Sequence, residues 1–239
     1  MTAIISKETI TRLLKDVKQI IKNPLTENGI YYSHDDSDIL KGYALIIGPS
    51  DTPYFGGNYF FEFTYPFDYP HSPPKVKYCT NGNNIRFNPN LYICGKVCVS
   101  LLNTWRGEQW TSCQSISSVL LTLCTLFCNN PLLNEPGITI TNNDMVPYNE
   151  IITFANLDVA VCDIVNKKPI VYLPFFDIFY SYVKENFVKN IDKFLEIAKK
   201  RNNEYKQQEF IFRTTLYGML VKADYNKVIE KLILAKNNL

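Results

Sequence analysis

The stretch Arg86-Phe-Asn-Pro-Asn-Leu-Tyr-Ile-Cys-Gly-Lys-Val-Cys-Val-Ser-Leu-Leu-Asn-Thr-Trp105 decides the fold of this 239-residue chain. It lies in a longer segment, 80–112, that has several turn-forming residues and little regular periodicity. Loops of this length are uncommon inside compact domains and are often functional. The stretch carries Cys94 and Cys98, two of the seven cysteines, and neither of the two histidines. It therefore predicts a long loop at a functional site, placed between more regular elements.

Regular elements are predicted on the N-terminal side of this loop. Residues 8–22 predict an amphipathic helix, because apolar residues recur on one stripe at helical period. The stripe consists of Leu13, Leu14, Val17, Ile20 and Ile21, and the cations Arg12, Lys15, Lys18 and Lys22 lie outside it. Aliphatic and aromatic runs at 43–47 and 59–65, separated by glycine and proline turns, predict a short antiparallel meander between residues 39 and 78. The proline-rich stretch 65–74 predicts a rigid turn.

Helical patterns dominate the C-terminal side. Segments 114–129, 150–166 and 175–201 have apolar residues at helical spacing, and 210–239 predicts one or two further helices. The predicted fold class is α+β. It has a core domain of residues 1–168, with an N-terminal helix, an antiparallel sheet, the long loop and helices. An α-helical C-terminal extension of residues 169–239 follows.

Composition limits the classes of function. Apolar residues make up 46% of the chain and charged residues 20%, which is ordinary for a globular protein with a packed core. The net charge of +2 argues against a nucleic-acid partner, since phosphate binding needs a concentrated basic face. No segment reaches the roughly 18–20 apolar residues of a membrane span, and the first residues lack a signal-peptide pattern. The seven cysteines are odd in number and irregularly spaced, so we expect reduced thiols in a cytoplasmic or nuclear protein, and no cofactor.

The cysteines leave two kinds of site open: a structural zinc site and the active site of a Cys-His hydrolase. Four of them form pairs of equal spacing, Cys94 with Cys98 and Cys124 with Cys128. Together these reach the ligand count of a structural zinc, although small buried thiols are commoner in a helical pattern such as that of the second pair. A Cys-His hydrolase needs a base within hydrogen-bond reach of its thiol, and neither His34 nor His71 lies in a recognisable protease context.

Several motifs resemble those of ubiquitin-conjugating enzymes. In that family seven residues separate a His-Pro-Asn motif from the acceptor cysteine, and here Asn88-Pro89-Asn90 precedes Gly95-Lys96-Val97-Cys98-Val99. Other matches are Tyr54-x-Gly-Gly, Tyr69-Pro70-x-x-Pro73-Pro74-Lys75-Val76, and Trp110 followed by Ile116-Ser117. Because independent motifs occur in the family's order over much of the chain, the resemblance is specific.

The resemblance is closer to a subgroup of large conjugating enzymes. This subgroup includes the partner of the second, dual-specificity ubiquitin-activating enzyme of animals. Its features here are Asn88 in place of the motif histidine, the insertion 102–107 around Trp105, and Asn134-Glu135-Pro136-Gly137. Asn149-Glu150 and the segment 159–164 also look like the C-terminal extension of that enzyme.

The resemblance implies roles for individual residues. Cys98 would carry ubiquitin or a ubiquitin-like modifier as a thioester. Asn90 would donate its amide to the oxyanion or hold the loop that does so, which is compatible with an Asx turn after Pro89. Glu135, or alternatively Asn134, would help the incoming lysine amine to lose its proton. The residues expected to support the motif are Asn88, Pro89, Trp105 and Trp110.

The implied partners are the modifier, an activating enzyme and a ubiquitin ligase. The cations Arg12, Lys15 and Lys18 fit the surface that the family presents to the activating enzyme. His71-Ser72 and Thr111-Ser112-Cys113 replace residues with which many relatives grip RING-type ligases, so the resemblance does not carry over standard RING docking. The alternatives are a catalytically silent binding module of the same fold and conjugation of a ubiquitin-like protein other than ubiquitin.

Overall fold

A four-stranded sheet forms the centre of the structure. The computed structural model describes residues 5–82, 84–168, 173–206 and 208–239. The strands pair in sequence order, each antiparallel to the next. They are β1 (Ile30–His34), β2 (Lys41–Ile47), β3 (Asn58–Thr64) and β4 (Lys75–Tyr78). The predicted antiparallel meander is confirmed, and its first strand begins upstream of the region in which the sequence pattern placed it.

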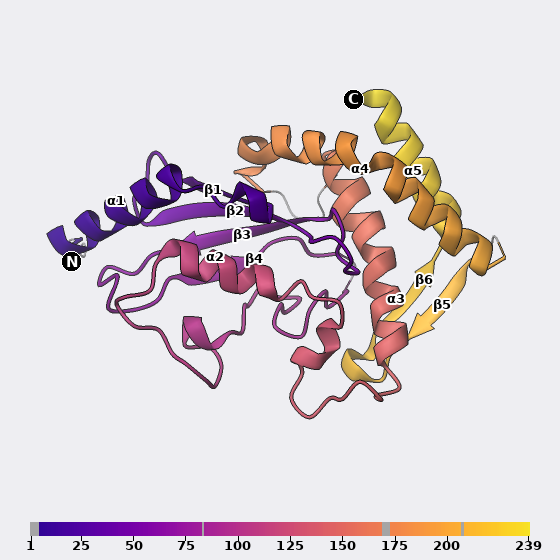
Figure 1. The fold of residues 1–239 in the computed structure, drawn as a ribbon, viewed down its shortest axis with the longest axis horizontal. Helices are drawn as coiled ribbons and strands as arrows, with labels where there is room; N and C mark the ends of the chain where they lie inside the picture. The colour runs from indigo at the N-terminus through magenta and orange to yellow at the C-terminus, as the bar shows by residue number, and fades with distance from the viewer. Residues whose placement is uncertain (1–4, 83, 169–172, 207) are drawn as a thin grey trace.

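Helices pack around this sheet and form the C-terminal part of the molecule (Figure 1). The α-helices are α1 (Lys7–Lys22), α2 (Ile116–Thr125), α3 (Met145–Ala155), α4 (Phe176–Glu204) and α5 (Tyr225–Asn238). Short turns are η1 (Thr26–Asn28), η2 (Ser100–Leu102), η3 (Pro131–Asn134) and η5 (Leu216–Gly218), and η4 (Asn156–Asp163) is a π-helix. No helix of the described ranges is long and apolar enough to cross a membrane.

The alternation of side chains along β3 divides its contacts between two layers. Tyr59 stacks on Phe127, which lies just beyond α2, with ring centroids 4.4 Å apart. Phe60 contacts Phe179 of α4, with centroids 6.2 Å apart. Two stacked pairs continue the α4 layer: Tyr43 with Phe175 and Tyr31 with Tyr182. Because successive residues of a strand face opposite sides, the sheet is covered by the α2 layer on one face and by the C-terminal extension on the other.

The first helix matches its prediction, but its buried stripe differs. The buried residues are Thr9, Leu13, Asp16 and Ile20. Leu14 and Ile21, which were expected to be buried, are 48% and 73% exposed. The reason is Asp16, whose carboxylate accepts hydrogen bonds from Arg12 Nε at 3.0 Å and from the Tyr69 hydroxyl. A paired carboxylate therefore occupies the face that apolar periodicity alone assigned to aliphatic residues.

Helix α3 continues directly into the π-helix η4, and the widened turn places Asn156 in the core. Its Oδ1 accepts a hydrogen bond from the Tyr59 hydroxyl at 2.7 Å, and its Nδ2 donates to the Phe55 carbonyl at 2.9 Å. A Cβ atom at Gly57 would lie 1.9 Å from that Oδ1. The Tyr54-x-Gly-Gly motif therefore requires glycine at this position because the α3–η4 segment approaches it so closely.

The C-terminal extension is largely helical, as predicted, and also contains a hairpin. The expectation of helices throughout 210–239 is wrong in its first part, where β5 (Phe210–Arg213) pairs antiparallel with β6 (Leu220–Ala223) before α5 begins. The aromatic and aliphatic residues of β5 and a glycine turn at φ +57° favour strands over a helix. The predicted division at residue 168 adjoins residues 169–172, and the expected lack of a signal-peptide pattern rests partly on residues 1–4; both segments lie outside the described residues. The domain division stays a prediction.

Candidate active site

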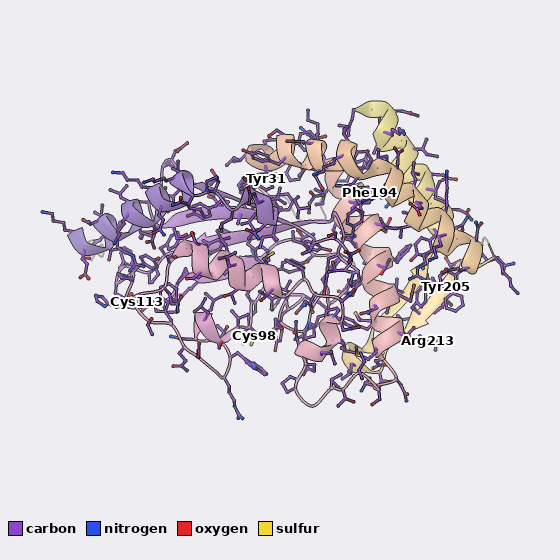
Figure 2. All side chains as sticks on the ribbon, viewed as in Figure 1. Tyr31, Cys98, Cys113, Phe194, Tyr205 and Arg213 are labelled. Atoms are coloured by element: carbon purple, nitrogen blue, oxygen red, sulfur yellow. The ribbon has the colours of Figure 1, made fainter. Side chains whose placement is uncertain are left out.

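Cys98 lies in the long loop between β4 and α2, and its thiol faces the backbone of the same loop. The side chain is 3% exposed, and Sγ donates to the Thr104 carbonyl at 2.9 Å. The Thr104 hydroxyl accepts from the Val99 amide at 2.9 Å and donates to the Val97 carbonyl at 3.0 Å. Cys98 lies below α2 in the view of Figure 2. The loop therefore has a defined structure around the thiol, built by the insertion that follows the cysteine.

Asn90 and Cys98 are joined by two hydrogen bonds. The Cys98 amide donates to the Asn90 carbonyl at 2.9 Å, and Asn90 Nδ2 donates to the Cys98 carbonyl at 2.6 Å. The Oδ1 of Asn90 is buried and has no hydrogen-bond partner among the described residues. Of the two roles that the resemblance implies for Asn90, holding the loop is the one that this geometry displays.

Asn88 takes the place of the family's motif histidine and is fully buried. Its Oδ1 accepts from the Asn90 amide at 2.9 Å, and its Nδ2 donates to the Leu126 carbonyl at 2.8 Å and to the Tyr54 hydroxyl at 3.3 Å. An asparagine amide supplies both an acceptor and two donors, so it satisfies all three groups at once. The neighbouring Pro89 is also buried. Asn88 thus fixes the loop to the segment that follows α2.

The two tryptophans of the chain have different environments. Trp110 is 7% exposed, its Nε1 donates to the Pro70 carbonyl at 2.7 Å, and its amide donates to Asn103 Oδ1 at 2.9 Å. Trp105 is 44% exposed, within an exposed part of the insertion. Trp110 therefore attaches the end of the loop to the proline-rich turn, whereas Trp105 offers an apolar surface beside the loop that holds Cys98.

Glu135 immediately follows η3, and its carboxylate accepts a hydrogen bond from the Tyr217 hydroxyl of the C-terminal extension. The pKa of Tyr217 is raised above its ordinary value, mainly by burial and secondly by this hydrogen bond. The phenol therefore remains the proton donor. Asn134, the alternative, is half-buried and its Nδ2 has no hydrogen-bond partner in the described part of the chain. The structure therefore distinguishes Glu135 as the carboxylate that is held in place.

The predicted cationic surface of α1 divides into two parts. Arg12 donates to Asp16 and to the carbonyls of Ser112 and Gln114, so its guanidinium is engaged within the chain. The expected contact of Arg12 with the activating enzyme stays a prediction. Lys15 and Lys18 are exposed, as a contact surface requires.

Neither histidine takes part in the site. His34 bonds the Tyr32 hydroxyl and the Ile39 carbonyl, at 2.8 and 2.9 Å. His71 pairs with Glu8 at 3.3 Å on the surface. Since the thiol of Cys98 bonds a carbonyl instead, the arrangement lacks the base that a Cys-His hydrolase needs.

The other thiols do not form a ligand cluster. Among the described residues, no group of three or more His, Cys, Asp or Glu side chains converges as a metal site would require. Four thiols are weakened as nucleophiles because burial raises the pKa of each, to about 12 for Cys79. The other three are Cys124, Cys128 and Cys162.

Three residues that shape this site were not predicted from the sequence: Thr104, Arg86 and Tyr217. Thr104 stood inside the quoted insertion, and its position six residues after Cys98 was the available signal. Arg86 donates to the Pro89 carbonyl at 2.5 Å. Tyr217 is 82 residues from Glu135 in sequence, so no local pattern connects the two.

Comparison with known proteins gives consistent matches. The profile of the family described as "Ubiquitin-conjugating enzyme" matches residues 12–154. The chain is 42% identical over 199 residues to "Ubiquitin-conjugating enzyme E2 Z" of Danio rerio, covering 82% of this chain and 59% of that protein. It is 46% identical over 164 residues to the Homo sapiens protein of the same name, covering 67% and 46%.

A third relative is the Homo sapiens "Dual E2 ubiquitin-conjugating enzyme/E3 ubiquitin-protein ligase BIRC6". It is 48% identical over 106 residues, which are 42% of this chain and 2% of that protein. The matches to the E2 Z proteins span about half of their length, between 46% and 62%.

Proposed function

Because the chain belongs to the ubiquitin-conjugating enzyme family, we propose that Cys98 accepts ubiquitin, or a ubiquitin-like modifier, from an activating enzyme as a thioester and passes it to a lysine amine or to a ligase. The observation that carries this proposal is the pair of hydrogen bonds between Asn90 and Cys98. They attach the asparagine of the family motif directly to the cysteine that the motif predicts as the acceptor.

The first step is an exchange between thioesters. The Cys98 thiol loses its proton, and the thiolate attacks the carbonyl of the modifier bound to the activating enzyme. A sulfur–carbon bond forms at Cys98, and the thiolate of the activating enzyme leaves. One thioester replaces another, so the step requires mainly that the reacting groups be positioned. The exposed cations Lys15 and Lys18 are the proposed contact with the activating enzyme.

The second step forms an amide. A lysine amine attacks the thioester carbonyl, negative charge develops on its oxygen, and the Cys98 thiolate leaves. Asn90, hydrogen-bonded to the backbone of Cys98, is the proposed support for that charge; loss of one such donor typically costs about 10²–10³ in rate. The incoming amine has an ordinary pKa of about 10.4 and has to lose a proton, so a carboxylate accepting its hydrogen bond assists. Glu135 is the proposed carboxylate.

The proposed location is cytoplasmic or nuclear, because all seven cysteines are free thiols, as proteins of reducing compartments have them. We propose that a ligase contacts the chain in a way that differs from standard RING docking. The Ser112 carbonyl already accepts a hydrogen bond from Arg12 of α1, and His71 pairs with Glu8. The exposed Trp105 is a further feature that a partner contact could use.

A loading assay tests the proposal. The purified chain is mixed with an activating enzyme, Mg-ATP and ubiquitin or a related modifier, and the products are separated with and without reducing agent. We expect an adduct that reducing agent removes, no adduct for Cys98→Ala, and an adduct that resists reducing agent for Cys98→Ser. Cys113→Ser, a change of an exposed thiol, is the matched control and should load normally. No adduct in a panel of activating enzymes and modifiers, or normal loading of Cys98→Ala, contradicts the proposal.

A catalytically silent binding module is the second candidate, and the burial of Cys98 is the observation in its favour. A thiol that is 3% exposed has to be uncovered before it reacts. The same assay separates the two functions, because a silent module folds and binds but forms no adduct.

A further inference from the structure

The turn between β5 and β6 brings one strained residue of the C-terminal extension against the active-site segment. Tyr217 has φ +63°, in the left-handed region that bulky residues rarely occupy. Such a conformation costs on the order of 1–3 kcal/mol and persists where surrounding contacts enforce it. Asp144 supplies those contacts, since its carboxylate accepts from the amides of Thr215 and Leu216 at 3.0 and 2.7 Å. Figure 1 shows this turn at the lower end of α3, beside the loops of the core.

The ring of Tyr217 forms one side of a stack around Arg86. The guanidinium carbon lies 4.4 Å from the centroid of Tyr217 and 3.8 Å from that of Tyr92. The same guanidinium donates to the carbonyl of Pro89, between the two asparagines of the motif. Because Arg86 is held between two rings, its planar donor has a fixed direction toward that carbonyl.

The hydroxyl of Tyr217 reaches the other candidate catalytic group. It donates to the carboxylate of Glu135, whose segment lies far from Arg86 in sequence. Contacts thus run without interruption from Glu135 through Tyr217, Arg86 and Pro89 to Asn90, which bonds Cys98. A single residue of the extension therefore contacts both the proposed carboxylate and the arginine that bonds the motif of Asn90.

We propose that Tyr217 is a positioning residue for the amide-forming step: its hydroxyl orients the Glu135 carboxylate, and its ring holds Arg86 against the motif that carries Asn90. This inference rests on the proposed function. It makes the C-terminal extension part of the catalytic apparatus through this residue, which acts through Glu135 and Arg86. The loading step needs only the Cys98 thiol and its partners, so it should be nearly independent of Tyr217.

The test compares loading with discharge in the full chain. Each variant is loaded with ubiquitin, the activating enzyme is then stopped by removing ATP, and loss of the thioester to added free lysine is followed over time at pH 7 to 9.5. We expect Tyr217→Ala to discharge about tenfold more slowly at pH 7, which is less than the roughly hundredfold that losing a positioned base brings. Loading should change less than twofold.

The defect should shrink toward pH 9.5, because more of the lysine is already unprotonated as pH approaches its pKa. Tyr217→Phe removes only the hydroxyl, so it should slow discharge by no more than Tyr217→Ala does. Because the hydroxyl acts through Glu135, the double variant Tyr217→Phe with Glu135→Gln should be no slower than Glu135→Gln alone. Arg86→Lys keeps the charge but loses the planar stack, and should slow discharge at all pH values. Ile211→Ala, an exposed position on the same hairpin, is the control and should behave as the wild type.

The outcomes separate this inference from the proposed function. If the wild type never loads, the proposed function fails. If it loads but Tyr217→Ala and Tyr217→Phe both discharge at the wild-type rate, the function stands and the role of Tyr217 is overturned. An equal loss of loading and discharge, independent of pH, shows only structural support and also overturns it. Should Tyr217→Ala not fold, Tyr217→Phe decides alone.

Discussion

At the scale of single residues, the buried hydrogen bonds of Asn88 predict an effect on stability that is separate from catalysis. Asn88→Ala removes an acceptor from the Asn90 amide and a donor from the Leu126 carbonyl, both in a buried site. Leaving buried polar groups unsatisfied costs about 1–3 kcal/mol, so we expect a loss of this size in the free energy of unfolding, measured with urea. Asn129→Ala, at an exposed position, is the control and should stay within about 0.5 kcal/mol of wild type.

The sequence was informative about residues whose role depends on neighbours in the chain. Cys98 and Asn90 were predicted because their spacing is fixed within one loop, and the structure joins them by hydrogen bonds. Arg12 illustrates the limit: the helical pattern placed it on an open face, whereas its partners, the carbonyls of Ser112 and Gln114, lie 100 and 102 residues away. No periodicity contains that information, since such contacts form only when the chain folds.

At the scale of elements, α4 covers the sheet face opposite α2 and should be a main source of its stability. Phe179 is 1% exposed and packs on Phe60. Phe179→Ala should lower the free energy of unfolding by about 3–5 kcal/mol, because it removes buried apolar area and leaves a cavity. Val188→Ala, on the same helix but 63% exposed, should change it by less than about 0.5 kcal/mol. Similar effects of the two substitutions, measured by urea unfolding, would contradict the role given to α4.

Elements with a single clear period were predictable, and those with competing signals were not. The span of α4 followed from apolar residues at helical spacing. The hairpin β5–β6 was missed because its strands have four residues each, too few for alternation to outweigh the helical signal that continues into α5. The π-helix η4 was also not predicted from the sequence, because a π-helical segment has nearly the same apolar pattern as an α-helix. The difference lies in the position of Asn156, which the wider turn places against Tyr59.

At the scale of the whole molecule, the predicted boundary at residue 168 and the contacts of the extension lead to different expectations for unfolding. A separable extension would melt by itself and leave the core intact. The extension, however, supplies Phe175 and Tyr182 to the sheet and Tyr217 to the active-site segment. Since these contacts pack aromatic rings of the extension against the core, we expect core and extension to stabilise each other.

Two signals of the intact chain test this coupling. Both tryptophans, Trp105 and Trp110, belong to the 1–168 part, so tryptophan fluorescence follows the core. The helices α4 and α5 contribute 29 and 14 residues of the extension, so far-ultraviolet circular dichroism weighs the extension heavily. We expect the two urea transitions to coincide, as they do for a cooperative unit. Phe179→Ala should then shift both to lower urea by the same amount, because the residue joins the two parts. If it shifts the dichroism transition alone, the core and the extension unfold as independent domains.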